Sequence, residues 1–258
     1  MRRPGACLDA PVTVRAPGEL EGLVRVGRVV AHTLRRMRAA VVPGVATAEL
    51  DALAERYARA QGARSAPRLT YGFPGFTCIS VNEEIVHGIP GARRVRPGDV
   101  VKLDVTLELG GFIADAAVTV LVPPVSPVAQ RLRRCARAAF GRAMDAARPG
   151  RPVSAIGAAV DGEVRRHGFS VVRELSGHGV GRRLHEAPAV PNFEDPEARA
   201  LLHEGLVLAV EPMATVRPAR VVTESDGWTL RTHDRGLAVH HEHTIVVRRG
   251  APVIVTAA

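Results

Sequence analysis

The sequence predicts an α+β fold in which two similar halves share a mainly antiparallel sheet, with helices covering one of its faces. Two observations carry this prediction. The intervals 43–62 and 149–168 have the same length and the same order of features: Pro-Gly, a Thr or Ser followed by Ala, an amphipathic segment and a closing glycine. Each interval also follows a long amphipathic segment and precedes short runs of β-branched residues. This recurrence indicates two halves related by a pseudo-twofold axis.

Composition sets the broad class of protein. The chain has 258 residues, of which 46% are hydrophobic, so it can bury a large core. We expect one domain over residues 17–258, preceded by an extended or disordered arm at residues 1–16. No run of about eighteen apolar residues is present, which argues against a membrane span. The three scattered cysteines, and the absence of an apolar stretch after the N-terminal arginines, predict a cytoplasmic protein.

The charge balance is strongly basic. The net charge is +9, and Lys102 is the only lysine. Such a preference for arginine is typical of a bias in genomic base composition and largely needs no functional explanation. A basic surface would suit a polyanion such as ribosomal RNA. No basic run alternates with aromatic residues, so we expect no specific DNA binding.

Two helices are predicted in the first half. Over residues 17–42 the apolar side chains recur at helical spacing, and the Pro-Gly pair at 43–44 stops the pattern. We expect Thr47 to cap a second helix, which runs to about residue 60 and ends at Gly62. The second helix should bury a stripe that includes Leu50.

The second half repeats this pattern. A long helix is predicted over residues 127–147 and is broken by the Pro-Gly pair at 149–150. Ser154 is expected to cap the following helix, which ends at Gly168.

Between the two pairs of helices, residues 98–122 predict a β-hairpin that carries two acids. The glycine pair at 110–111 tolerates the positive φ of a two-residue turn. With that turn, Asp115 lies opposite Thr106 and diagonal to Asp104, so both acids point to the same face, roughly 5 to 8 Å apart. They could be polar residues on a solvated face, or half of a metal site, since two buried carboxylates would otherwise repel one another.

The second half also has strand-like runs with isolated acids. Residues 205–213 form an apolar run that ends at Glu211, and residues 237–247 place Glu242 on another. His178 lies among three glycines, which would let the backbone approach a ligand closely. A histidine in such a setting can equally be a hydrogen-bonded core residue.

These acids and the histidine together predict a metal centre. Four ionised carboxylates carry a charge of −4, which two divalent cations would match. Oxygen-rich ligation with one imidazole and no thiolate suits Mn²⁺, Fe²⁺, Co²⁺ or Zn²⁺, and paired metals of this kind are typical of hydrolytic sites. The five candidate ligands are Asp104, Asp115, His178, Glu211 and Glu242.

Over residues 17–255 the chain resembles the type I methionine aminopeptidases, which have the pita-bread fold. The matching stretches are CISVNEEIVHGIP (78–90), LDVT (103–106), FIADAAV (112–118), SGHGVGRRLHE (176–186), VEPM (210–213), DGWTLRTHDR (226–235) and EHTIVV (242–247). The resemblance implies an enzyme that removes the initiator methionine from nascent proteins when the second residue is small. It also implies a pair of divalent cations (Co, Mn, Fe or Zn) bound by the five candidate ligands.

The resemblance further assigns residues to catalysis. His87 matches a histidine near the scissile nitrogen, although it could instead cap its own turn. His185 matches one that faces the substrate carbonyl and would steady the developing oxyanion. Glu211 is the best candidate to shuttle a proton. His240 is a candidate for an additional metal ligand.

The methionine side chain needs an apolar pocket. Three residues stand at positions that line this pocket in the family: Cys78, Phe73 and Trp228, the last of which could equally serve the core. The sequence departs from the family at three positions: Leu184 stands where Phe is usual, Thr70 where an aromatic residue is common, and Ala116 where a hydroxyl is frequent. These departures put the selectivity for methionine in doubt.

Other readings remain open. A prolidase or Xaa-Pro aminopeptidase would use the same five ligands, but such enzymes usually have a large additional N-terminal domain. A non-catalytic pita-bread binding module, or a metal-free creatinase-like enzyme, would typically lose ligands. We expect a monomer whose partners are nascent polypeptide N-termini. A further hypothesis is docking on the ribosome through the arginine-rich segments 25–38 and 131–142.

Overall fold

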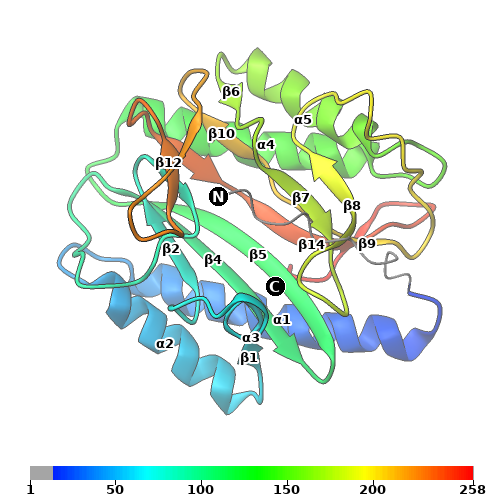
Figure 1. Ribbon diagram of the computed structural model, residues 1–258, viewed down its shortest axis with the longest axis horizontal. Helices are drawn as coiled ribbons and strands as arrows, with labels where there is room; N and C mark the ends of the chain where they lie inside the picture. Colours follow the sequence, from blue (N-terminus) through cyan, green and yellow to red (C-terminus); the bar gives the residue numbers. More distant parts are fainter. Residues whose placement is uncertain (1–13, 258) are drawn as a thin grey trace.

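The structure is a computed structural model that describes residues 14–257 (Figure 1). Most of the predicted arm, residues 1–13, therefore lies outside the described residues. Figure 1 shows the helices of the first half beside the first-half strands of a central sheet and those of the second half beside its second-half strands. The predicted α+β class is confirmed.

The first half begins with two long helices, α1 (Pro17–Ala40) and α2 (Thr47–Ala60). Gly44, with φ of +92°, turns the chain between them as predicted. The predicted cap was wrong. The N-cap of α2 is Ala46, whose N–H donates to the Glu49 carboxylate, while the Thr47 hydroxyl bonds to the backbone of Gly91. The hydroxyl thus ties the start of α2 to a distant loop.

The second half has the corresponding pair, α4 (Pro127–Ala146) and α5 (Ser154–Arg166). Gly150 has φ of +85°, close to the value at Gly44, so the two Pro-Gly breaks have similar conformations. Ser154 does not cap α5, because the N-cap position is occupied by Val153 and no side chain caps it. A short helix that was not predicted, α3 (Ala66–Tyr71), precedes the sheet strands of the first half.

The central sheet has nine strands, all paired antiparallel, in the order β1-β4-β5-β14-β9-β7-β8, with β2 on β4 and β15 on β14. Two three-stranded sheets, β13-β10-β6 and β11-β12-β3, flank it. The strands are β1 (Arg64–Ser65), β2 (Cys78–Val81), β3 (Glu84–Val86), β4 (Val100–Leu109), β5 (Phe112–Leu121), β6 (Ser170–Val171), β7 (Ser176–Gly179), β8 (Glu186–Pro191), β9 (Val207–Val210), β10 (Met213–Thr215), β11 (Val221–Thr223), β12 (Leu230–Thr232), β13 (Ala238–His240), β14 (Glu242–Val246) and β15 (Val253–Ile254).

The predicted hairpin is confirmed in its register. β4 and β5 pair so that Thr106 faces Asp115 and Asp104 faces Ala117. Gly110 and Gly111 have φ of +61° and +81°, the pair of positive angles that a two-residue type I′ turn requires. The two acids therefore share one face of the sheet.

Two runs expected to be single strands are each divided. β9 ends at Val210, and the chain re-enters another sheet as β10 after Glu211-Pro212. Likewise β13 and β14 belong to different sheets, with His241 between them. Proline has no N–H to continue the ladder, which explains the first break.

Each half has its own hydrophobic core. One core packs α1 and α2 against β4 and β5, and it includes Leu23, Leu50 and Leu103. The other packs α4 and α5 against the strands of the second half, and it includes Leu132 and Ile156. None of the helices among residues 14–257 is long and apolar enough to cross a membrane.

The only lysine is fully buried in the sheet. The Lys102 ammonium donates to the carbonyls of Asn82 and Val100, and burial lowers the pKa of Lys102 to about 7. Asn82 has φ of +57° and also bonds to Asp99 through its side chain. Lys102 therefore fixes the turn between β2 and β3, a role that composition alone could not reveal.

Candidate metal centre

The five candidate ligands come from five neighbouring strands. β4, β5, β14, β9 and β7 are consecutive in the sheet, and each carries, or is directly followed by, one candidate ligand. Asp104 and Glu242 both lie opposite Ala117, one from each side, so all three share a row and a face. The small side chain of Ala117 leaves space between the two carboxylates. Ala209 lies opposite His178 on the neighbouring strand, and its small side chain likewise leaves space beside the candidate ligand.

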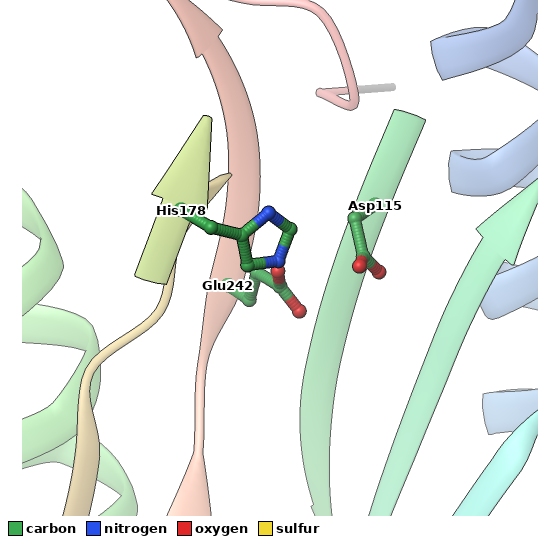
Figure 2. A group of neighbouring side chains, drawn as sticks. All are labelled: Asp115, His178 and Glu242. Carbon is green, nitrogen blue, oxygen red and sulfur yellow. The ribbon is translucent and has the colours of Figure 1, made fainter. Parts of the chain in front are cut away.

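The ligand atoms converge in two overlapping groups. Atoms of Asp115, His178 and Glu242 lie within 4.8 Å of one another, and so do atoms of Glu211, His240 and Glu242. Figure 2 shows the His178 ring and the carboxylates of Asp115 and Glu242 turned toward one another from three strands. Glu242 belongs to both groups, whereas Asp104 belongs to neither.

Burial and mutual repulsion disfavour the ionised forms of the four carboxyl groups. Burial, and then the charges of Asp115 and Glu211, raises the pKa of Asp104 well above its ordinary value, and burial with the other three acids does the same for Glu242. Burial raises the pKa of Asp115 to about 6 and that of Glu211 to about 8. Oδ1 of Asp104 is buried with no hydrogen-bond partner. Buried acids that repel one another, one of them with an oxygen that no donor reaches, fit a site for cations.

His178 presents a free lone pair to this site. Burial, followed by the charge of His185, lowers its pKa to about 3, so the ring is neutral. Nδ1 lies 2.9 Å from the carbonyl oxygen of Gly179 and must be the protonated nitrogen, because a carbonyl only accepts. Nε2 is then the acceptor, and it lies 3.6 Å from Oε1 of Glu211. This tautomer suits a metal ligand.

His240 also faces the acids. Its Nε2 lies 3.4 Å from Oε2 of Glu211 and 3.6 Å from Oε2 of Glu242, yet neither ring nitrogen makes a hydrogen bond. Thr119 holds the backbone of His240 on both sides, accepting from its N–H and donating to its C=O. The geometry favours the reading of His240 as an additional ligand, which the sequence left open.

Threonine hydroxyls orient Asp115. Oγ1 of Thr106 donates to Oδ1 of Asp115 over 2.8 Å. Oγ1 of Thr244 accepts from the Asp115 N–H and donates to the Asp115 carbonyl. The hairpin register already placed Thr106 opposite Asp115, so this partner could have been inferred from the sequence.

Two further histidines adjoin His178. The ring centroid of His185 lies 4.2 Å from that of His178, and burial lowers the pKa of His185. The Tyr71 hydroxyl lies 2.5 Å from Nδ1 of His185. Sequence reasoning missed Tyr71, which is 114 positions away. His87 follows β3 with φ of +59° and is near enough for its charge to lower the pKa of His178.

The residues expected to line the pocket for the methionine side chain lie in two separate places. Cys78 pairs directly with Asp104 across β2 and β4, and burial with nearby acids raises the pKa of its thiol. Phe73 and Trp228 form an edge-to-face contact with ring centroids 5.2 Å apart. The first residue is therefore beside the acids, and the other two form an aromatic pair.

The departures from the family pattern lie in different environments. Leu184 is buried and directly precedes His185, whereas Thr70 is exposed at the end of α3. Ala116 lies in the core of the first half and alternates with Asp115, so its side chain points away from the acids. A hydroxyl at this position would not reach the ligand face.

Comparisons with known proteins agree with this geometry. A model of Metallopeptidase family M24 matches residues 21–249. Methionine aminopeptidase 2 of Bacillus subtilis is 40% identical over 92% of this chain and 96% of its own length. Methionine aminopeptidase of Clostridium perfringens is 37% identical over 95% and 98%.

Solved structures give the same picture of the fold. The crystal structure of methionine aminopeptidase from Thermotoga maritima superposes with a TM-score of 0.92 at 34% identity, covering 96% of this chain and all of that one. Prolidase from Pyrococcus furiosus gives a TM-score of 0.78 at 19% identity, and the match covers 95% of this chain but only 66% of that one. At that identity the second likeness concerns the fold alone.

Proposed function

Because this chain belongs to metallopeptidase family M24, we propose that it is a methionine aminopeptidase that removes the initiator methionine from polypeptides whose second residue is small. The observation that carries the proposal is the pair of overlapping ligand groups that share Glu242. We propose that this site would hold two divalent cations (Co, Mn, Fe or Zn). Their ligands would be Asp104, Asp115, His178, Glu211 and Glu242.

The electrostatics of the site support this occupancy. Bound divalent cations would supply Lewis acidity toward a carbonyl and lower the pKa of water toward neutrality. The donor set fits them, since burial and mutual repulsion raise the pKa values of four carboxyls, and cations would remove the repulsion.

In this proposal Glu211 moves the proton. Its carboxylate lies between His178 and His240, at 3.6 and 3.4 Å, and is largely buried. Burial raises the pKa of Glu211 to about 8 in the metal-free site, so its carboxylate has a high affinity for a proton. In the metal-bound site we assign it to accept a proton and return it to the departing amine.

His185 and His87 would orient the scissile bond. If the Tyr71 hydroxyl donates to Nδ1 of His185, the ring proton resides on Nε2 and can be donated to the carbonyl oxygen as negative charge develops. We assign His87 to the amide nitrogen of the substrate.

The methionine side chain would contact Cys78 and the aromatic pair Phe73–Trp228. A thiol and two aromatic faces suit a thioether, because sulfur makes favourable contacts with ring edges. Turnover of Met-Ala-Ser against norleucine-, leucine- and phenylalanine-headed analogues would measure how far the pocket selects methionine.

The decisive experiment combines metal content with peptide turnover. The purified protein should contain two divalent cations per chain and hydrolyse Met-Ala-Ser but not Ala-Pro. Glu211→Gln should lower kcat by roughly 10²- to 10⁴-fold. Preferential turnover of Ala-Pro would favour the prolidase-like reading. Activity that survives thorough chelation would favour a metal-free enzyme, and absence of any turnover would favour a binding module.

Three expectations about the cellular setting remain predictions. We propose a cytoplasmic monomer that acts on nascent polypeptide N-termini. Docking on the ribosome through residues 25–38 and 131–142 is tested by co-sedimentation at low salt, and failure to co-sediment would remove it. Size-exclusion chromatography with light scattering tests the monomer.

A further inference from the structure

A cavity of about 430 Å³ lies against the helix-covered side of the sheet and is lined by α1, α4 and β5. Four of its lining residues are arginines. Arg35 and Arg38 come from α1, and Arg133 and Arg137 come from α4. Spacings of three and four residues place each pair on one side of its helix, so each pair can act as a unit.

Among residues 14–257 these arginines lack acidic partners. In the part of the chain that the structure describes, no carboxylate forms an ion pair with any of the four, and Nε of Arg133 is buried without a hydrogen-bond partner. Arg142, further along α4, shows the contrast because it pairs with Glu163. Burial, and then the charges of Arg38, Arg137 and Arg134, lowers the pKa of Arg133, so the cations repel one another. An anion in the cavity would relieve this repulsion.

The cavity adjoins the candidate metal centre at His240, which lines it together with Thr119. His241 and His243 line it, and both rings contact Phe140 of α4. They flank Glu242 in the sequence, and because successive side chains of an extended chain alternate between its faces, they point away from the side that the Glu242 carboxylate faces. The arginines of the cavity and the acids of the metal centre therefore lie on opposite faces of the sheet, and His240 borders both.

We propose that this cavity binds a small organic bisphosphate, with one phosphate on the Arg35–Arg38 pair and the other on the Arg133–Arg137 pair. Planar guanidinium groups match phosphate oxygens through paired N–H donors. Four cations match the three to four negative charges of a bisphosphate, whereas a single phosphate would compensate only half of them. Leu34 and Val118 supply apolar surface for the carbon skeleton.

The shape of the site favours a small molecule over nucleic acid. The volume lies within the usual range of small-ligand pockets. Single-stranded RNA is typically held by a groove with aromatic platforms for its bases, and no Phe, Tyr or Trp is among the described residues that line this cavity. The proposed binding of a bisphosphate does not depend on the proposed peptidase activity, so the two proposals are tested separately.

Calorimetric titration of the purified protein with fructose 1,6-bisphosphate, at fixed ionic strength, tests the proposal. One site per chain is expected. Arg38→Gln/Arg137→Gln should weaken binding at least roughly tenfold, as loss of charge-assisted hydrogen bonds predicts. The matched control, Arg25→Gln/Arg28→Gln, removes the same charge from exposed residues of α1 outside the cavity and should leave affinity within roughly twofold.

Three results would overturn the proposal. The first is that the two double variants bind fructose 1,6-bisphosphate with equal affinity. The second is that the protein binds fructose 1,6-bisphosphate no more tightly than inorganic phosphate. The third is that it binds a ten-nucleotide single-stranded RNA more tightly than the bisphosphate at the same salt. The last would assign the surface to nucleic acid instead. Arg38 and Arg137 are exposed, so their replacement leaves the core intact, and circular dichroism checks this. If the double variant misfolds, the single variants Arg38→Gln and Arg137→Gln carry the same comparison.

Discussion

Tyr71 joins the residues expected to act in catalysis, although nothing in its sequence context indicated such a role. Tyr71→Phe removes the hydroxyl that contacts Nδ1 of His185 while keeping the ring. Loss of one hydrogen bond of about 0.5–1.5 kcal/mol predicts a roughly 2- to 12-fold lower kcat/KM for Met-Ala-Ser. The loss should fall mainly on kcat, because His185 is proposed to act as the oxyanion develops.

The chain offers a matched control for this substitution. Its only other tyrosine, Tyr57, also contacts a histidine Nδ1, that of His32 at 3.2 Å, but on the helical side of the molecule. Tyr57→Phe should leave kcat/KM unchanged. Equal effects of the two substitutions on kcat/KM would remove the positioning role of Tyr71.

At this scale the sequence predicted the residues whose chemistry conflicts with their surroundings. Asp104, Asp115, Glu211 and Glu242 interrupt apolar strands, so each one stands out in a one-dimensional pattern. Tyr71 does not, because an aromatic residue at the end of a short helix has many ordinary explanations. Only the folded chain brings it to His185.

At the scale of elements, Asp51 shows how a helix positions the strand that carries Cys78. It lies on the buried side of α2, and its carboxylate accepts from the backbone N–H groups of Phe76 and Thr77 and from the Thr77 hydroxyl. Asp51→Ala would leave these buried donors unsatisfied, so we expect a loss of about 2–4 kcal/mol of unfolding free energy, measured by urea denaturation.

Asp161 provides the comparison for Asp51. It is equally buried on α5, but its side chain pairs with the exposed Arg165 one turn away. Asp161→Ala should cost about 1 kcal/mol or less. If both substitutions cost the same, the hydrogen bonds of Asp51 are not what stabilises the segment before β2.

A second element, the turn that carries Trp228, predicts an acid-sensitive signal. Although burial raises the pKa of Asp226, hydrogen bonds from Thr229 and from the N–H of Trp228 outweigh it and lower the pKa overall. A depressed carboxyl pKa contributes stability above the unfolded value, near 3.9, and loses it as the pH falls through the folded value. Fluorescence of Trp228, the only tryptophan, should therefore change as the pH falls below about 4.

Two variants isolate this signal. Asp226→Ala should show the altered fluorescence already at pH 7. Asp234→Asn, at a separate turn whose aspartate bonds to Gly236, should keep the wild-type acid step. A far-UV circular dichroism transition with the same midpoint would indicate global unfolding and not a local change in the turn.

Among the elements, the hairpin could be predicted to the residue because a glycine pair fixes the turn and period-two alternation fixes the faces. Thr47 and Ser154 were wrongly taken as caps because each has the right chemistry one position too late: the N-caps are Ala46 and Val153. Local hydrogen-bonding competition decides such positions by a single residue, and the sequence does not resolve it.

At the scale of the whole molecule, the repeat visible in the sequence becomes two cores that meet at one acidic site. Asp104 and Asp115 come from the first half, and His178, Glu211 and Glu242 come from the second. Equal spacing of the Pro-Gly pairs was enough to predict two halves. It could not predict the strand order β5-β14-β9, in which the halves join through the pairing of β5 with β14 and which depends on contacts distant in sequence.

Cations that bind both halves should stabilise the entire fold. A ligand at one hundred times its Kd adds about 2.7 kcal/mol, and a chain of this size gains roughly 2–4 °C in Tm per kcal/mol, so chelation should lower Tm by roughly 5–10 °C. Differential scanning calorimetry with and without EDTA, followed by readdition of Mn²⁺, measures this shift. Glu242→Gln should abolish most of it, whereas Asp161→Asn, a buried acid elsewhere, should not.

The pH dependence of this shift follows from the raised pKa values. In the metal-free protein Asp115 titrates near 6 and Glu211 near 8, both above their unfolded values, so the folded state binds additional protons and loses stability as the pH rises through this range. Cations replace those protons. The rise in Tm on adding Mn²⁺ should therefore be larger at pH 8 than at pH 6. A shift that is independent of pH, or one that Glu242→Gln retains, would mean that the cations bind away from these carboxylates.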